Sequence, residues 1–317
     1  MHPKPDLARA ATSAFDPVVA QTALDGLTAA RKTLPPHLLY DPEGCRLFDA
    51  ITTLPEYYVT RTELALLRRV GPEVAALIGP GASVIEYGAG SVTKAALLLQ
   101  ALESPAAYAP LDIAEVAVEG TVAAMRKRFP AIALHPIVGN FMEPIALPDV
   151  PQPLLGFFPG STIGNLDRPA AIAFLTAVRQ SLGQGARFLV GVDLPKDPAI
   201  LVPAYDDAAG VTAAFNMNLL HRLNREAAAE FDLAGFRHEA RWNAAHSRIE
   251  MHLCSRGAQS VSVAGQPIRF AAGETIHTES SYKHARGAFL DMARAAGWES
   301  EACWTDDAQL FSMHLLR

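Results

Sequence analysis

The sequence predicts an α/β protein built on a doubly wound parallel sheet. Between about Thr62 and Asp193, short apolar runs that suit buried strands alternate with amphipathic helical stretches, which is typical of such sheets. A tight glycine turn, Gly88-Ala89-Gly90, follows the first apolar run. Polar residues follow the later runs, at the strand ends where open α/β sheets bind ligands.

The first strand and turn predict a ligand site. The run from Ser83 to Tyr87 suits a strand covered on both faces, and Gly88 and Gly90 let the backbone turn sharply and approach a ligand. Ser91 or Thr93 is expected to cap the next helix, whose first amides favour a polar ligand group. The alternative is that the two glycines form only a structural turn.

The ligand predicted for this turn is a nucleoside without a pyrophosphate. A dinucleotide fingerprint requires a third glycine where Thr93 stands, and the sequence has no Gly-Lys-Ser/Thr phosphate loop. Asp112 lies 24 positions beyond Gly88, about where a ribose-binding carboxylate belongs. S-adenosylmethionine fits better than NAD, and its sulfonium would be favoured by the charge of Glu86. The alternative is that Asp112 is a solvated strand end.

Composition limits the classes of partner and compartment. A net charge of −6 without a Lys/Arg block argues against nucleic acid and anionic membranes. The three cysteines form no Cys-x-x-Cys pair and the histidines no His-x-His cluster, so we expect neither disulfides nor a metal. No apolar run approaches the ~18 residues of a membrane span, and Met1 to Asp6 leads into no signal-peptide core. These features predict a cytoplasmic protein.

The first part of the chain, to about Thr60, contains no obvious parallel strand. Val18 to Ala30 reads as helix, prolines follow, and Leu47 to Ile51 reads as a short helix. Three tyrosines in the segments between them suit a lid, because a phenol packs its ring and still presents a hydroxyl. The alternative is that they are ordinary half-buried loop aromatics. The three are Tyr40, Tyr57 and Tyr58.

The regular βα part predicts five strands and the helices between them. The strands are expected at Ser83 to Tyr87, Tyr108 to Asp112, Ile132 to Val138, Pro153 to Phe158 and Arg187 to Asp193. The helices are expected at Glu63 to Ile78, Ala95 to Leu99, Ala114 to Phe129 and Arg168 to Leu182.

The run from Phe157 to Leu166 is a second candidate site. Two glycines, two hydroxyls and an amide follow an apolar strand there. The carboxamide of Asn165 both donates and accepts, as recognition of an amino acid's carboxylate or amine demands. The alternative is that Asn165 caps the helix that begins near Asp167.

After Asp193 the βα rhythm stops. Asp197 to Ala229 reads as helices, and strand alternation follows in Arg237 to Cys254 and Ser260 to Phe270, which predicts an antiparallel insertion or second domain. A helix from Ala288 to Ala296 then leads into Trp298 to Thr305 and Leu310 to Leu316, expected as the last, antiparallel strands of the sheet.

Four motifs in order carry a resemblance to a known family. The chain resembles the histidine-specific methyltransferases of ergothioneine biosynthesis from about Leu34 to its C-terminus. The motifs are Leu-Pro-Glu-Tyr-Tyr-x-Thr-Arg-Thr-Glu at Leu54 to Glu63, Gly-Ser-Thr-Ile-Gly-Asn at Gly160 to Asn165, Ala-Tyr-Asp-Asp at Ala204 to Asp207, and Thr-Glu-x-Ser at Thr278 to Ser281.

The resemblance implies trimethylation of the α-amino group of L-histidine by S-adenosylmethionine, giving hercynine and S-adenosylhomocysteine without a metal. It implies a Rossmann-like methyltransferase domain, expected at residues 61–196 and 283–317. It also implies an α+β substrate-binding or lid domain, expected at residues 1–60 and 197–282. We expect a monomer whose partner is a small-molecule substrate.

Site residues are implied motif by motif. The residues that resemble the family's cofactor contacts are Gly88, Lys94, Asp112, Asn140 and Phe141. The substrate carboxylate would be held by Tyr57, Asn165 and Tyr205, and the reacting amine would lie near Tyr40 and Gly160. The imidazole would be recognised by Glu279 and Ser281, with Met251 packing on the ring. Tyr40, Asn165 and Gly160 are the expected catalytic set, with Tyr40 orienting the amine.

Two departures from the family pattern have consequences. The family usually has Asp where Asn140 stands, so weaker cofactor affinity is expected. Tyr282 and His284 flank Lys283 where relatives vary, which bears on fine substrate preference. The competing hypotheses are a methyltransferase for another amino acid such as tryptophan or tyrosine, a noncatalytic ligand-binding homologue, and a nicotinamide dehydrogenase.

Overall fold

The computed structural model describes residues 15–90 and 92–317. Residues 1–14 and Ser91, a candidate helix cap, lie outside the described residues. The chain divides into two compact units. The first comprises the described residues up to Ile51 with Tyr205–Arg241 and Glu250–Glu279, and the second comprises Thr52–Ala204, Trp242–Ile249 and Ser280–Arg317. The predicted domain limits instead placed residues 52–60, 197–204, 242–249 and 280–282 in the substrate-binding domain, and those limits stay a prediction.

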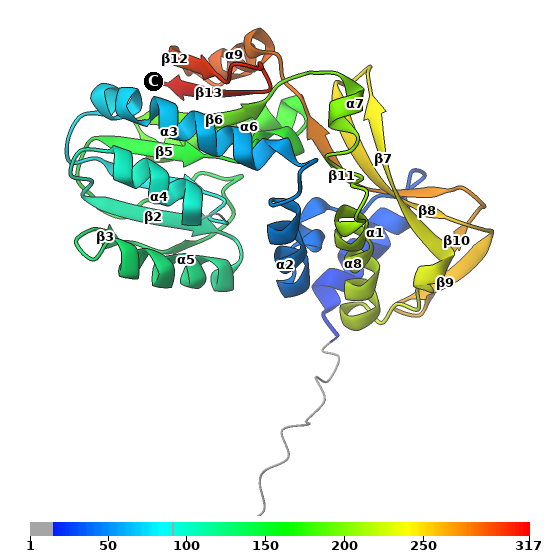
Figure 1. The fold of residues 1–317 in the computed structure, drawn as a ribbon. Coiled ribbons are helices and arrows are strands. Elements are labelled where there is room, and N and C mark those ends of the chain that lie inside the picture. The colour runs from blue at the N-terminus through cyan, green and yellow to red at the C-terminus, as the bar shows by residue number, and fades with distance from the viewer. Residues whose placement is uncertain (1–14, 91) are drawn as a thin grey trace, which may run out of the picture. The chain divides into compact units, whose positions relative to one another are not determined.

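The second unit is built on one mixed sheet (Figure 1). Its strands are β1 (Ser83–Tyr87), β2 (Ala107–Asp112), β3 (Ala133–Leu134), β4 (Ile137–Val138), β5 (Leu154–Phe158), β6 (Arg187–Asp193), β12 (Ser300–Thr305) and β13 (Phe311–Leu316). Within the described chain their order is β12-β13-β6-β5-β1-β2-β3, with β4 also pairing β2. Strands β1 to β6 pair in parallel, whereas β13 and β12 are antiparallel, as predicted. The predicted α/β fold class is confirmed.

Helices cover both faces of this sheet. In Figure 1, α3, α4 and α5 lie over one face, and α6 and α9 pack on each other over the opposite face. Their bounds are α3 (Tyr58–Ile78), α4 (Val92–Ala101), α5 (Glu115–Arg128), α6 (Arg168–Leu182) and α9 (Arg286–Ala295), with short turns η2 (Thr162–Asn165) and α7 (Pro198–Leu201). Among the described residues, no helix has the length and apolar character needed to cross a membrane.

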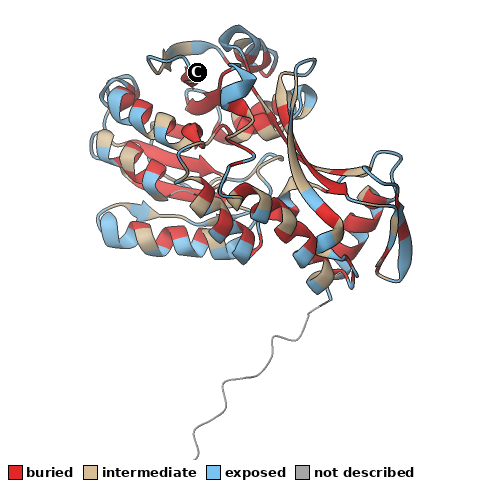
Figure 2. Ribbon diagram, turned by 45° about the vertical axis from the view of Figure 1, so that its right-hand side comes forward, coloured by how far each residue is buried: buried red, intermediate tan, exposed pale blue. Residues whose placement is uncertain are grey.

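The core under α6 and α9 is aromatic. The rings of Phe158 and Phe174 lie 4.4 Å apart, and those of Phe188 and Trp298 lie 5.7 Å apart. All four side chains are buried. In Figure 2 the central strands are almost entirely red, the colour of buried residues. Both faces of the sheet are therefore shielded from solvent, as the continuous apolar runs predict.

The order of the strands reverses next to β1. Strand β1 pairs with β2 on one side and β5 on the other, and the parallel register aligns their carboxyl ends at one edge. In open α/β sheets this switch point is where ligands bind. Gly88, which follows β1, Asp112, which ends β2, and Pro159, which follows β5, therefore share that edge.

Three sequence predictions differ locally. The single strand expected at Ile132 to Val138 is split into β3 and β4, because Pro136 between them has no N–H for the ladder. The helix expected from Glu63 begins at Tyr58, so the Leu54 to Glu63 motif is helical from Tyr58 onward. Thr93 lies inside α4 and is not its cap.

The first unit combines helices with short sheets. Its elements are α1 (Pro17–Leu27), η1 (Pro36–Leu39), α2 (Pro42–Ile51), α8 (Val211–Glu226), η3 (Leu233–Gly235), β7 (Phe236–Asn243), β8 (Arg248–Ser255), β9 (Gln259–Val263), β10 (Gln266–Phe270) and β11 (Thr275–Tyr282). Helix α8 packs on α1 and α2, and β9 pairs antiparallel with β10. Strands β11-β8-β7 form a second small sheet, and the division between the units falls within these three strands.

Candidate active site

The turn after β1 brings the predicted cofactor residues Gly88 and Phe141 together. Gly88 has φ +75°, and its amide donates to the carbonyl of Leu111 at 2.8 Å. A Cβ added to Gly88 would lie 3.8 Å from the ring of Phe141 and 3.9 Å from that of Phe158. Glycine is therefore favoured here both by the left-handed backbone and by the two rings beside it.

Glu86 is a fully buried carboxyl just before this turn. The hydroxyl of Tyr108 donates to its Oε2, while Oε1 has no hydrogen-bond partner among the described residues. Burial raises the pKa of Glu86 to about 8, although the hydrogen bond from Tyr108 and the charge of Lys94 oppose the rise. A buried, unsatisfied carboxyl at a ligand edge fits a cationic ligand group, because a nearby positive charge stabilises its ionised form.

Asp112 ends β2 at the same edge. Its Oδ1 accepts from the amide of Ala114 at 2.8 Å, which fixes the carboxyl at the strand end. Partial burial raises the pKa of Asp112, against the backbone hydrogen bonds of Ala114 and Ile113. A fixed, half-buried carboxylate is better suited to bind a ribose hydroxyl than a fully solvated carboxylate is. The ribose role of Asp112 stays a prediction.

Asn140 is exposed, and its amide oxygen is already engaged. Oδ1 accepts from the amide of Met142 at 3.1 Å, which assigns the oxygen and leaves the NH₂ group pointing elsewhere. Beside it, the ring of Phe141 lies 5.9 Å from that of Phe158. The structure therefore joins Phe141 to the glycine turn, while Asn140 is held by its own backbone turn.

Lys94 is paired with a carboxylate that the sequence analysis missed. Its Nζ lies 2.6 Å from Oε2 of Glu63, and both side chains are buried. Oε1 of Glu63 also accepts from the amide of Gly160 at 2.8 Å. Gly160 has φ +83°, and a Cβ there would lie 3.2 Å from Lys94 Nζ. One buried carboxylate thus holds a predicted cofactor residue and a predicted catalytic residue side by side.

Asn165 lies in the loop after β5 and does not cap the next helix. Asp167 caps α6, since its side chain accepts from the amide of Ala170 at 2.9 Å. The alternative that Asn165 is this cap is therefore wrong. Asn165 lies half-buried at the end of η2, and the preceding Gly164 packs so closely that an added Cβ would lie 2.7 Å from the carbonyl of Tyr282.

A buried charge cluster at the end of β6 was also missed from the sequence. Asp193 accepts from the Tyr58 hydroxyl at 2.7 Å and pairs with Lys283 at 2.8 Å and Lys196 at 2.5 Å. Burial alone would raise the pKa of Asp193, but the two lysines bring it below its ordinary value. Burial lowers the pKa of Lys196 to about 8, against the pull of Asp193. The amide of Asp193 also donates to Ser161 Oγ at 2.9 Å, which ties the cluster to the loop after β5.

In the first unit, a buried histidine supports Tyr205. His238 Nε2 lies 2.8 Å from the Tyr205 carbonyl, and Nδ1 lies 2.9 Å from Nδ2 of Asn216. The same Asn216 nitrogen donates to the His252 carbonyl, which assigns the amide and so the tautomer with the proton on Nε2. Burial lowers the pKa of His238, against the hydrogen bond to Tyr205, and keeps the ring neutral.

The remaining substrate residues of the first unit lie on different elements. Tyr40 is partly exposed and packs edge-on against Phe215, with centroids 5.6 Å apart. Met251 on β8 and Glu279 on β11 are buried, and the carbonyl of Met251 accepts from the hydroxyl of Thr278 at 3.0 Å. This bond places the predicted imidazole-recognising segment next to the predicted packing residue.

The predicted site residues divide between the two units. All five cofactor residues belong to the second unit, as do Tyr57, Gly160, Asn165 and Ser281. Tyr40, Tyr205, Met251 and Glu279 belong to the first. The roles of these residues stay predictions.

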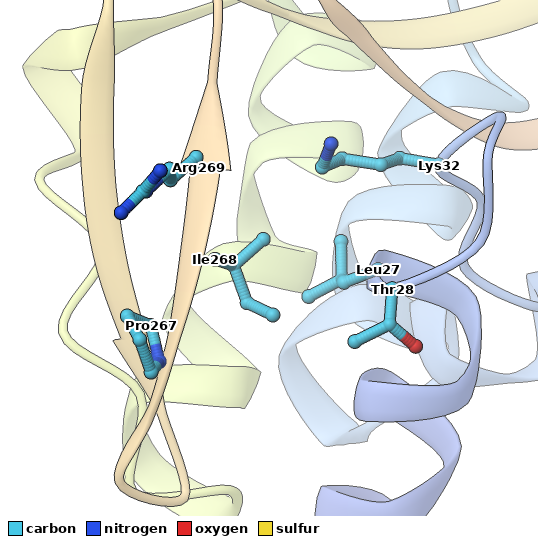
Figure 3. A pocket seen from close by; sticks show the side chains of 6 residues that line it. All are labelled: Leu27, Thr28, Lys32, Pro267, Ile268 and Arg269. Carbon is cyan, nitrogen blue, oxygen red and sulfur yellow. The ribbon is translucent and has the colours of Figure 1, made fainter.

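A hollow of about 440 Å³ lies within the first unit (Figure 3). Its lining contains none of the residues predicted for substrate or cofactor. Its lysine, Lys32, forms an ion pair with Glu274 and lies over the ring of Phe270, so its charge is already neutralised by a partner. We assign it no ligand. The lining residues are Leu27, Thr28, Lys32, Pro267, Ile268 and Arg269.

Comparison with known proteins gives consistent matches. Residues 19–317 match the family described as histidine-specific methyltransferase, SAM-dependent. The chain is 43% identical over 296 residues to a histidine N-alpha-methyltransferase of Mycolicibacterium smegmatis, covering 92% of each chain. It is 31% identical over 307 residues to ergothioneine biosynthesis protein 1 of Neurospora crassa, covering 90% of this chain and 33% of that protein.

One solved structure supports the fold. A crystal structure described as a possible exported protein from Bordetella parapertussis has a TM-score of 0.51 to this chain at 13% identity. The match covers 95% of this chain and 94% of that one. At this level of identity the likeness speaks for the fold alone.

Proposed function

Because this chain belongs to the histidine-specific, SAM-dependent methyltransferase family, we propose that it trimethylates the α-amino group of L-histidine to hercynine, a step of ergothioneine biosynthesis. The family predicted from the four motifs is confirmed, and the chain is a SAM-dependent N-methyltransferase. The observation that carries the proposed substrate is the family match over residues 19–317. The buried carboxyl of Glu279, two residues before the buried Ser281 hydroxyl on β11, supports it.

The edge of the sheet at β1 and β2 would hold S-adenosylmethionine. When bound, it supplies a methyl group already activated by a sulfonium. Gly88 and Phe141 would line the adenosine, and Asp112 would accept a hydrogen bond from a ribose hydroxyl. Glu63 would hold Lys94 in position through their ion pair. The unsatisfied oxygen of Glu86 supports a cationic ligand at this edge. The chain's own task is then chiefly to position the amine.

Substrate recognition would use both ends of the amino acid. Tyr57, Asn165 and Tyr205 would hold the carboxylate, and the neutral His238 supports the carbonyl of Tyr205. Glu279 would accept from one imidazole N–H, and Ser281 would meet the other ring nitrogen. Residues two apart on a strand face the same side, which suits two contacts to one small ring. Met251 would pack on the ring.

The amine must lose a proton before each transfer. A free α-amino group titrates at about pH 8, so a modest downward shift is sufficient and no strong base is needed. Tyr40 would orient the amine, and the Gly160 backbone would lie near it. We also propose that the enzyme acts without a metal, as a cytoplasmic monomer, and without nucleic acid or membrane partners.

Mass spectrometry of the products tests this proposal. The protein is incubated with S-adenosylmethionine and each of the twenty amino acids in separate reactions. A mass gain of three methyl groups confined to histidine is expected. A gain on another amino acid, such as tryptophan or tyrosine, would redirect the substrate assignment. Binding of S-adenosylmethionine without any methylated product would identify a noncatalytic homologue.

A further inference from the structure

A second hollow lies within the second unit, beside the start of α9. It has a volume of about 390 Å³, and all of its lining residues belong to that unit. The lining contains none of the residues predicted for substrate or cofactor. Tyr282 and His284, which the sequence analysis associated with fine substrate preference, both line it. A hollow of this size is within the range of small-molecule sites.

The lining of this hollow carries one unpaired positive charge. As far as the structure describes it, the lining contains no aspartate or glutamate, and its lysine and arginine are Lys283 and Arg168. The ammonium of Lys283 is neutralised by Asp193, which lies 2.8 Å away. Arg168 begins α6 and is exposed, and within the described chain its guanidinium forms no hydrogen bond or ion pair. An unpaired guanidinium beside a cavity favours an anionic group there.

The first turn of α9 adds backbone donors to the same wall. The helix begins at Arg286, and no side chain of the described residues caps it, since the N-cap residue is Ala285. Both Ala285 and Ala288 line the hollow. The first amides of a helix have no acceptor within the helix and lie at the positive end of its dipole. An anionic group in the hollow therefore gains from these amides as well as from Arg168.

His284 places an unsatisfied nitrogen beside the hollow. The residue lines the hollow and is 9% exposed, and its Nε2 has no hydrogen-bond partner among the described residues. Burial, with the charges of Lys283 and Arg168, lowers the pKa of His284 to about 4, so near neutral pH the ring is uncharged and can donate one N–H. Buried polar nitrogens rarely lack a partner in folded proteins. An acceptor oxygen in the hollow supplies one.

Backbone hydrogen bonds hold two walls of the hollow in place. The amide of Lys283 donates to the carbonyl of Ser247 at 2.7 Å, and the hydroxyl of Ser247 donates to the carbonyl of Lys283 at 2.9 Å. The amide of His284 donates to the carbonyl of Asp193 at 3.0 Å. The hollow is therefore formed before any ligand enters, as most small-molecule sites are.

We propose that this hollow binds a small organic anion, with its carboxylate at Arg168 and the start of α9 and its apolar body against Pro195 and Met292. One unpaired positive charge matches a monoanion such as a carboxylate better than a doubly charged phosphate. The lining also includes Pro195 and the buried Met292, whose apolar surfaces an inorganic anion leaves uncovered. The inference goes beyond the proposed function and does not depend on it.

Isothermal titration calorimetry of the full-length protein tests the proposal with benzoate as the probe. Benzoate carries a carboxylate on a flat apolar ring, benzamide has the same shape without the charge, and inorganic phosphate has the charge without the ring. Benzoate is expected to bind with a Kd of about 1 mM or below, and the other two at least about fivefold more weakly. Saturating histidine with S-adenosylhomocysteine is expected to leave the Kd of benzoate within about twofold.

Four variants at exposed positions locate the bound probe. Arg168→Gln is expected to weaken benzoate binding about fivefold, and Ala288→Leu, which fills the hollow from the helix surface, is expected to abolish measurable binding. Arg126→Gln and Ala123→Leu make the same exchanges on α5, outside the lining, and are the matched controls. Both controls should keep the Kd of the wild type within about twofold.

Nuclear magnetic resonance of the imidazole nitrogens gives a second readout. Benzoate is expected to shift the signals of His284, which are assigned by their absence in His284→Gln. It should leave those of the exposed His221 on α8 in place.

Several outcomes would overturn the inference. They are no binding of benzoate up to about 10 mM, equal affinity for benzamide or phosphate, and unchanged affinity in Arg168→Gln and Ala288→Leu. Displacement of benzoate by histidine would place the probe in the substrate site and would also overturn it.

Discussion

Oε2 of Glu63 on α3 lies 2.6 Å from Nζ of Lys94 on α4; the side chain of Glu63 is inaccessible to solvent and that of Lys94 is 9% accessible. The same carboxylate accepts from the amide of Gly160 after β5. A Cβ added to Gly191 on β6 would collide with the carboxylate of Glu63, so the glycine leaves room for it. One charge therefore connects two helices and a loop at the ligand edge of the sheet, and its removal has consequences for both stability and binding.

Glu63→Ala is expected to destabilise the protein by about 3 to 5 kcal/mol, because it leaves the Lys94 ammonium buried without its carboxylate. The double variant Glu63→Met with Lys94→Met removes both charges and is expected to be less destabilised than the single variant. Urea unfolding monitored by circular dichroism measures both. Equal or greater loss in the double variant would show that the carboxylate acts mainly through Gly160.

Glu86 predicts a pH dependence of cofactor affinity. Its pKa of about 8 means that the carboxyl is largely protonated near neutral pH. A sulfonium favours the ionised form, so binding of S-adenosylmethionine is expected to release this proton and to tighten as pH rises toward about 8, by up to tenfold per pH unit. Above that pH the dependence should level off.

Titration calorimetry across this range, with S-adenosylhomocysteine as comparison, checks the prediction for Glu86. The two ligands share the same amine and carboxylate but differ in the charge on sulfur, so only the first is expected to show the steep dependence. Glu86→Gln should make the two ligands behave alike. The same slope for both ligands with the wild type would rule out a contact between Glu86 and the sulfonium.

The sequence predicts the sheet well because buried strands carry a strong local signal. The apolar runs at Ser83 to Tyr87 and Arg187 to Asp193 coincide with β1 and β6 residue for residue. The signal fails where two local rules compete, as at Pro136, which interrupts an otherwise strand-like run. The cap of α6 shows the same limit, because Asn165 and Asp167 both suit a cap and only the backbone decides between them.

The buried charges were not predicted, since burial of a charged residue depends on contacts far apart in the sequence. Glu63 stands in an amphipathic helix, where a glutamate ordinarily faces solvent. Lys283 was read only as a position between two variable residues. Its partner Asp193 ends β6, far from Lys283 in the sequence, and nothing in the local pattern joins them. A ligand-site motif therefore identifies the residues that touch a ligand more readily than those that hold them.

Glu279→Ala is expected to raise KM for histidine about a hundredfold, since it removes a charged partner of the ring N–H, while KM for S-adenosylmethionine changes little. Glu279→Gln is a control of the same size that keeps an acceptor oxygen without the charge, and an intermediate value is expected. Initial-rate kinetics with each substrate varied in turn gives both constants. Unchanged KM for histidine in Glu279→Ala would remove this residue from the substrate site.

His284 predicts acid sensitivity of the fold. Burial, with the charges of Lys283 and Arg168, lowers its pKa from 6.5 to about 4. Because the unfolded chain takes up a proton at a higher pH than the folded one, the stability contributed by neutral His284 is complete above about pH 6.5 and is lost as pH falls toward 4. Between about pH 7 and pH 5 the loss should approach 2 kcal/mol.

Urea unfolding at these two pH values compares the wild type with His284→Gln, whose side chain does not titrate. The variant is expected to lose less stability on acidification than the wild type. The exposed His246, substituted by Gln in the same way, is the control and should leave the wild-type difference in place. An equal loss of unfolding free energy in His284→Gln and wild type between the two pH values would mean that His284 has the same pKa in the folded and unfolded states.

Asn140→Asp is expected to tighten binding of S-adenosylmethionine. The amide oxygen of Asn140 accepts from the amide of Met142, so the side chain presents its NH₂ group, a donor, to any neighbouring ligand. The family resemblance places an adenine amino group there, which is also a donor. An aspartate would keep the turn with one oxygen and offer the second as an acceptor, and the gain of one charge-assisted hydrogen bond corresponds to roughly tenfold in Kd. Titration calorimetry measures it, with Asn140→Ala as a control that removes the side-chain donor and acceptor together. Weaker binding by Asn140→Asp than by Asn140→Ala would show that the NH₂ group, and not an oxygen, is what the ligand requires at this position.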